Sequence, residues 1–136
     1  MKKQKAEDNA VVMKAYKKAY KSFGLTDTEA ALILGKTRAT LTRSHGFSPE
    51  SKEYELQVQF IRLFRSLFAI LGGDIDAMKL WFNTQNKHLN VTPRELTNKI
   101  IGLIYMNEYL DAMRVSGAYF TEIKQEWNGY VNYNLH

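Results

Sequence analysis

The chain of 136 residues contains no cysteine, and this absence removes several kinds of chemistry at once. Disulfide frameworks, thiolate zinc sites and cysteine nucleophiles all need the missing thiol. The absence leaves the compartment open but fits an intracellular, cytoplasmic setting. Charged residues are only 24% and apolar residues 45%, so the composition excludes wholesale disorder and predicts a folded core.

Long apolar runs are also missing. No stretch approaches 18 apolar residues without a charge, and no apolar segment follows the basic N-terminus. We therefore expect neither export nor a membrane partner. The modest length predicts one compact domain, or one small domain with an appended module, and argues against a two-domain enzyme.

Catalytic and metal-binding patterns are not found either. The histidines lack a second ligand at metal spacing: His45, His88 and His136. Residues 72–74 have no Walker lysine and no preceding strand, so they predict a helix end followed by a cap. Asp74 and Asp76 stand near a helix start, where the dipole favours carboxylates, and paired acid catalysis is the weaker reading. The sequence predicts no catalytic residues, no metal, no cofactor and no enzyme activity.

Positive charge is concentrated in the first third of the chain. Residues 1–50 hold 10 Lys/Arg against 5 Asp/Glu, whereas residues 51–136 hold 9 against 9. A local basic field beside a neutral remainder suggests that the first third meets a polyanion such as nucleic acid. A lysine-rich solvated face is the alternative.

Proline is scarce and strand-like alternation is nearly absent, so the sequence predicts an all-α fold. Capping boxes are expected at Thr26 with Glu29 and at Thr92 with Glu95, and Thr37 and Asp74 are further expected caps. The expected helices cover approximately residues 6–23, 26–34, 37–45, 48–71, 74–82, a short stretch after 92, and 101–115. The helix expected to begin at Ser48 and Pro49 is the longest.

This long helix is apolar over most of its circumference, so we expect it to be the central core helix or a dimer seam. Its narrow polar face is expected around Arg62, Arg65 and Ser66.

The last helix presents a run of apolar side chains: Ile101, Ile104, Tyr105, Tyr109, Ala112 and Met113. Residues 118–136 are rich in aromatics and are expected to pack on the body or on a partner.

Two short helices around Gly35 have the layout of a helix-turn-helix, whose second helix enters the DNA major groove. Ala31 and Gly35 stand four apart, with Leu41 six further on, as this motif requires. The residues expected to reach phosphates or base edges are Lys36, Thr37, Arg38, Thr40, Thr42 and Arg43. A helical hairpin with a polar outer face is the alternative.

With these residues in hand, the chain resembles the Xre/MbcA/ParS antitoxin family over roughly residues 10–120. The N-terminal resemblance lies in LTDTEAALILGKTRATLTR, and the C-terminal one is an ordered set of residues. That set is Ala77, Trp81, Phe82, Thr84, Asn86, Leu89, Thr92, Pro93, Glu95, Leu96, Gly102 and Gly117. The chain departs from the family at Gln85, at Asn90 and Val91 in place of a common glycine pair, and at Lys36 and Ser44, where apolar residues are usual.

The resemblance implies an antitoxin that binds a cognate toxin, commonly a RES-type enzyme that consumes NAD, and represses its own operon as a homodimer or larger assembly. Residues 1–46 would bind operator DNA, residues 47–120 would dimerise and bind toxin, and residues 121–136 form an aromatic-rich tail. The toxin-binding residues it implies are Tyr109, Met113, Arg114, Gly117, Ala118 and Tyr119. The rival interpretations are a freestanding helix-turn-helix regulator and an interaction protein whose helix-turn-helix is degenerate at Lys36 and Ser44.

Overall fold

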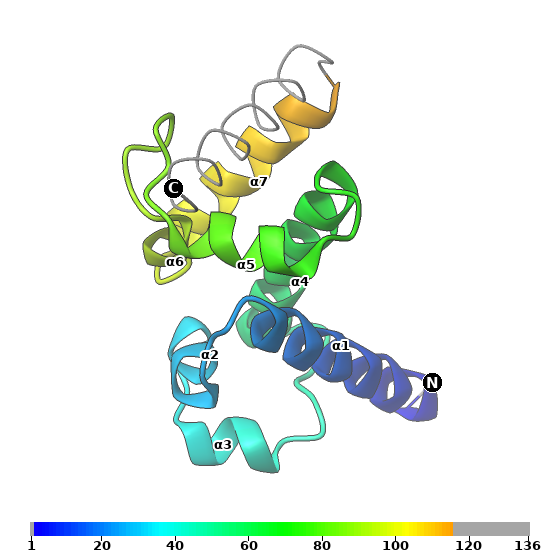
Figure 1. Cartoon of the computed structure of the whole chain (residues 1–136). Coiled ribbons are helices and arrows are strands. Elements are labelled where there is room, and N and C mark those ends of the chain that lie inside the picture. The colour runs from blue at the N-terminus through cyan, green and yellow to red at the C-terminus, as the bar shows by residue number, and fades with distance from the viewer. Residues whose placement is uncertain (1, 116–136) are drawn as a thin grey trace.

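The computed structural model describes residues 2–115, and the regular secondary structure in this part of the chain is entirely helical, as predicted. Figure 1 shows the order of the elements. They are α1 (Lys2–Ser22), α2 (Asp27–Ile33), α3 (Arg38–Arg43), α4 (Lys52–Ile70), α5 (Ile75–Asn83), α6 (Pro93–Leu96) and α7 (Ile100–Val115). Within these residues, no helix combines the length and the apolar character needed to cross a membrane.

Three of the expected caps are present. The Thr26 hydroxyl accepts from the N–H of Glu29 at 3.2 Å while the Glu29 carboxylate accepts from the N–H of Thr26, which completes the capping box. Thr37 caps α3, and Asp74 caps α5 through the N–H of Ala77 at 3.0 Å. These side chains fix where three helices begin.

One expected helix start and one expected capping box are wrong. Ser48 and Pro49 form a turn, closed by the N–H of Ser51 on the carbonyl of Ser48 at 2.9 Å, and α4 begins only after the Ser51 cap. Thr92 begins α6 without a side-chain cap. In this single turn, the N–H of Glu95 donates to the Thr92 carbonyl at 2.9 Å, so the backbone satisfies the donor that a capping box would use.

The long helix α4 lies between the N-terminal helices and α7, and it packs against α1 and α7. Phenylalanines join three elements where they meet. Phe23 stacks on Phe82 with ring centroids 4.2 Å apart, and Phe60 of α4 meets Phe23 edge-on at 5.7 Å. Both halves of the chain therefore share one core, and α4 is its central helix.

The buried faces of α4 and α7 differ from those expected. Ser66 is buried and Phe68 is 45% exposed, so the polar face of α4 does not run through Ser66. On α7, the core face consists of Leu103, Met106, Leu110 and Met113. Ile101, Ile104 and Tyr105 are exposed. Apart from a polar stripe of Asn107, Glu108, Asp111 and Arg114, α7 is apolar, so periodicity alone does not choose which part of its apolar surface is buried.

Candidate functional site

The turn between α2 and α3 is built from backbone contacts around Gly35. Gly35 takes a positive φ of 69°, which glycine adopts without a steric penalty. The N–H of Lys36 donates to the carbonyl of Ala31 at 2.9 Å and closes the end of α2. Leu41 of α3 is fully buried in the same core as Ala31. The two helices therefore form the helix-turn-helix expected from the sequence.

Two tyrosines of α1 hold α2 in place. The Tyr16 hydroxyl donates to the carbonyl of Ala30 at 2.7 Å, and the Tyr20 hydroxyl donates to the Asp27 carboxylate at 2.6 Å. Burial raises the pKa of both phenols, with the Asp27 carboxylate adding to the effect at Tyr20. Both groups stay protonated, so they act as fixed hydrogen-bond donors between α1 and α2.

The outer face of α3 presents four of the predicted DNA-contacting side chains to solvent: Arg38, Thr40, Thr42 and Arg43. The Thr37 hydroxyl accepts from the N–H of Thr40 at 3.2 Å, so Thr37 serves as the cap of α3. The hydroxyl of Thr42 donates to the carbonyl of Ala39 at 3.2 Å. Within residues 2–115 neither guanidinium forms an ion pair, which leaves both available to an anionic partner.

The two unusual residues of the motif, Lys36 and Ser44, have structural partners. The Lys36 ammonium lies 3.3 Å from the Glu53 carboxylate on α4. The pKa of Glu53 is lowered by a hydrogen bond from its own backbone N–H and then by Lys36. The Ser44 hydroxyl accepts from the N–H of Gly46 and donates to its carbonyl, both at 3.0 Å. Lys36 is thus directed toward α4 rather than being free like the arginines of α3.

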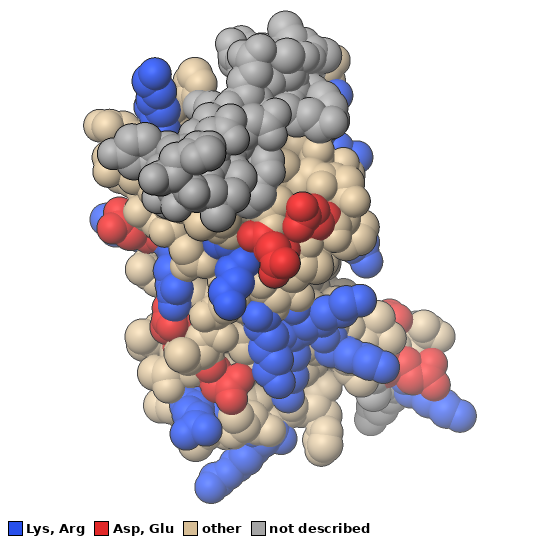
Figure 2. Space-filling view, in the orientation of Figure 1, with Lys and Arg blue, Asp and Glu red and all other residues tan. Residues whose placement is uncertain are grey.

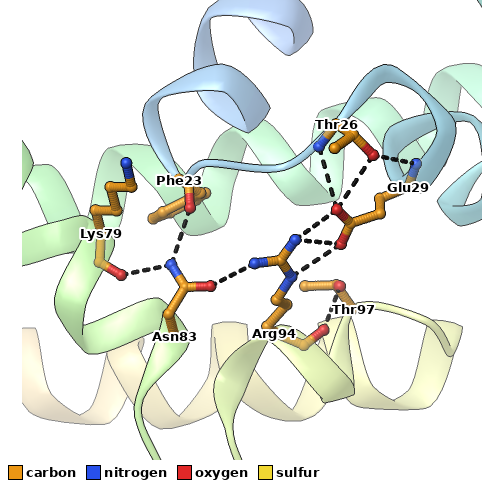
Figure 3. A network of polar contacts seen from close by, with 7 residues as sticks. All are labelled: Phe23, Thr26, Glu29, Lys79, Asn83, Arg94 and Thr97. Atoms are coloured by element: carbon orange, nitrogen blue, oxygen red, sulfur yellow. Dashed lines mark hydrogen bonds and ion pairs between the residues drawn. The ribbon is translucent and has the colours of Figure 1, made fainter.

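A polar network connects the helix-turn-helix to the C-terminal helices (Figure 3). Arg94 of α6 reaches both oxygens of the Glu29 carboxylate on α2, with its Nε donating at 2.9 Å. The Arg94 Nη1 donates to Asn83 at 2.7 Å, and the Asn83 amide donates to the carbonyl of Phe23 at 3.0 Å. Glu29 thus takes part in both the cap of α2 and the contact to α6.

The hydrogen bonds from Arg94 are the main reason that the pKa of Glu29 lies below its usual value, and the Thr26 N–H adds to the effect. Sequence reasoning assigned Glu29 to a capping box and Arg94 to a helix start, but it missed their contact. The two residues are 65 positions apart. Opposite charge was the only available signal, and it does not choose one partner among many.

The residues that carried the C-terminal resemblance build the core and the loop geometry. Ala77, Trp81, Phe82, Leu89 and Pro93 are buried. In the loop after α5, the Asn86 side chain accepts from the N–H groups of His88 and Leu89. Asn90 has a φ of +59°, which asparagine tolerates better than most residues, so it can replace a glycine there.

The toxin-binding residues implied by the resemblance fall into three groups. Tyr109 is half-buried on α7, with its ring 6.4 Å from that of His88, and Arg114 is exposed near the helix end. Met113 is buried in the core. Gly117, Ala118 and Tyr119 lie outside the described residues, as does the aromatic tail. Across the part that the structure describes, no three His, Asp or Glu side chains are grouped to hold a metal.

Comparison with known families gives two adjacent matches. Residues 4–62 match the model of an antitoxin Xre-like helix-turn-helix domain. Residues 66–115 match the model of the antitoxin Xre/MbcA/ParS C-terminal toxin-binding domain. The curated proteins include no significant match to this chain. The first match contains α2 and α3, the second contains α5, α6 and α7, and the Glu29–Arg94 contact joins the two matched regions.

Proposed function

Because the chain belongs to the Xre/MbcA/ParS family of antitoxins, we propose that it neutralises a cognate toxin of a type II system and represses its own operon. The toxin is proposed to be a RES-type enzyme that consumes NAD. The matched families are antitoxin families and not enzyme families. Protein binding and DNA binding, rather than catalysis, are therefore the proposed activities.

The observation that carries this proposal is the pair of family matches, one to a DNA-binding motif and one to a toxin-binding domain. Figure 1 shows α3 at one end of the described chain and α7 at the other. The two proposed partners would therefore approach different ends of the molecule. This arrangement supports simultaneous binding of operator DNA and toxin.

For the DNA contact, we propose that α3 enters the major groove. Arg38 and Arg43 would supply bidentate contacts to guanine or contacts to phosphate, and Thr37, Thr40 and Thr42 would supply hydroxyl contacts. Lys36 would act at the edge of this surface, since it also faces Glu53. A homodimer would place two such helices on a pair of half-sites.

For the toxin contact, we propose the C-terminal end of α7 and the residues that follow it. Tyr109 and Arg114 are the accessible candidates on α7, and Gly117, Ala118 and Tyr119 are the candidates that follow it in the sequence. Met113 would stabilise the helix from its core side, since it is only 1% exposed. An arginine and aromatic groups at one helix end fit the usual composition of a protein interface.

The proposal is tested by copurification with the product of the adjacent gene. Tagged full-length protein should retain that product in a fixed ratio, and a chain ending at Gly117 should lose it. The matched control is the variant with Arg38→Ala and Arg43→Ala. It should still bind the product of the adjacent gene but should no longer repress a reporter driven by the operon's promoter. Absence of any complex, together with intact repression, would instead favour a freestanding regulator.

A further inference from the structure

The exposed face of α1 has an unusual density of positive charge. Lys14, Lys17, Lys18 and Lys21 follow the spacing i, i+3, i+4 and i+7, which places them on one side of a helix. No acidic residue occurs between Asp8 and Asp27. We call these four residues the α1 lysine face. One lysine in the last turn suits the helix dipole, but four exceed that need.

The α1 lysine face is held rigidly by the opposite side of the helix. Met13, Tyr16, Ala19 and Tyr20 of α1, together with Phe23 just after it, are all at most 4% exposed. The four lysines are exposed or half-exposed. The basic residues that form ion pairs within residues 2–115 are others: Lys5, Lys36, Arg62 and Arg94. The four charges of the α1 lysine face are therefore not neutralised within the described chain.

This face borders the end of the helix-turn-helix. Lys14 and Lys17 line a shallow depression of about 320 Å³ together with Ser44 and His45, which directly follow α3. Figure 2 shows basic side chains gathered over α1, above the level of α3. Lys79 of α5 also lies near the end of α1, because a β-carbon added to Gly24 would come within 2.9 Å of the Lys79 Cε. The α1 lysine face therefore lies beside the residues that directly follow α3.

We propose that the α1 lysine face binds the phosphate backbone of DNA flanking the segment held by α3, an inference that rests on the proposed DNA binding. Lysine is a point charge suited to phosphate, without base specificity. The row from Lys14 to Lys21 spans about 10 Å at 1.5 Å per residue, enough to meet two or three phosphates of one strand. Lysine is depleted in protein interfaces, which favours DNA over the toxin as the occupant.

The test compares two variants of the full chain that lose the same charge. One carries Lys14→Gln, Lys18→Gln and Lys21→Gln; the control carries Lys52→Gln, Lys87→Gln and Lys99→Gln, which are exposed lysines outside α1 and the helix-turn-helix. Glutamine matches lysine in helix propensity, so both should melt like the wild type. Binding to a fluorescent 30-base-pair duplex of arbitrary sequence is titrated by anisotropy at several salt concentrations.

We expect the α1 variant to reduce the slope of log K against log salt by about 1.8 to 2.7, because each of two or three lost phosphate contacts contributes about 0.9, while the control keeps the wild-type slope. Equal slopes for the wild type and the α1 variant, or equal losses in both variants, would overturn the inference. If either result is obtained but the variant with Arg38→Gln and Arg43→Gln binds DNA more weakly than the wild type, the inference fails and the proposed function survives. Failure of the wild type to bind DNA at low salt would overturn both.

Discussion

At the scale of single residues, Gly102 shows how closely α7 and α6 approach. A β-carbon at this position would lie 2.0 Å from the carbonyl oxygen of Leu96, far inside van der Waals contact. We expect Gly102→Ala to lower the free energy of unfolding by about 3 kcal/mol, the upper end of typical overpacking costs. Chemical denaturation measures this change in the free energy of unfolding. The control is Glu108→Ala, which lies on the exposed side of α7 and should leave the free energy of unfolding nearly unchanged. An unchanged midpoint for Gly102→Ala would mean that the helices separate easily.

Trp81 is the second residue whose role is structural. It is 8% exposed and belongs to the shared core, so Trp81→Ala should cost roughly 3 to 5 kcal/mol of stability. Its indole Nε1 is buried without a partner among the described residues. Trp81→Phe should therefore cost much less, since it breaks no hydrogen bond. Equal melting temperatures for wild type and Trp81→Ala would instead mark Trp81 as a surface anchor.

In the sequence, both residues belong to the set that carries the family resemblance. An aromatic residue on an expected helix favours a core position, and Trp81 is buried in the structure. Gly102 was noticed only as part of a family pattern, since a glycine inside a helix has no local explanation. The reason is the backbone of α6, which packs against α7 only in the folded chain.

At the scale of elements, the contact between Glu29 and Arg94 joins α2 to α6. The two side chains are 36% and 33% exposed, so solvent weakens their attraction. We expect a double-mutant cycle with Glu29→Gln and Arg94→Ala to give a coupling energy of about 1 kcal/mol. Urea denaturation of the four proteins measures it. Additive single changes would show that the pair contributes nothing beyond its separate parts.

The same pair predicts how stability depends on pH. The Arg94 hydrogen bonds hold the folded-state pKa of Glu29 below its ordinary value of 4.5. A lowered pKa contributes stability that is complete above about pH 4.5 and is lost as pH falls through the folded value. Denaturation between pH 6 and pH 3 should therefore show a smaller loss in Glu29→Gln than in the wild type. Parallel curves would contradict the assignment.

The helix α3 carries the element-scale prediction for DNA. Arg38→Ala with Arg43→Ala should weaken operator binding by about 2 to 6 kcal/mol if both side chains read bases. If both touch only phosphates, the slope of log K against log salt should fall by about two units. Anisotropy titration with the operon's promoter DNA distinguishes these cases. Unchanged binding would remove α3 from the DNA surface.

Helix starts show which element features local sequence can predict. The caps at Thr26, Thr37 and Asp74 involve residues three positions apart, and the sequence identified all of them. The start expected at Ser48 and Pro49 is displaced by about one turn, because the Ser51 side chain caps the beginning of α4. Local signals therefore predict that a helix begins nearby but not always which residue begins it.

At the scale of the whole molecule, α4 organises both matched regions around one core. Its aromatic Phe60 meets Phe23, which directly follows α1, and Phe82 of α5. The all-α class and the order of helices followed from the sequence, because periodicity and helix ends are local. Which side of α7 is buried did not follow, since α7 is apolar over most of its circumference and only packing on α4 selects its face.

The most direct test of the account is neutralisation of the adjacent gene's product. Induced alone in a heterologous bacterial host, that product should stop growth and lower cellular NAD. Coexpression of the full chain should restore both, and the Arg38→Ala with Arg43→Ala variant should restore them equally, because toxin binding is assigned to the other end of the molecule. Continued growth arrest with abundant, folded full-length protein would contradict the antitoxin assignment.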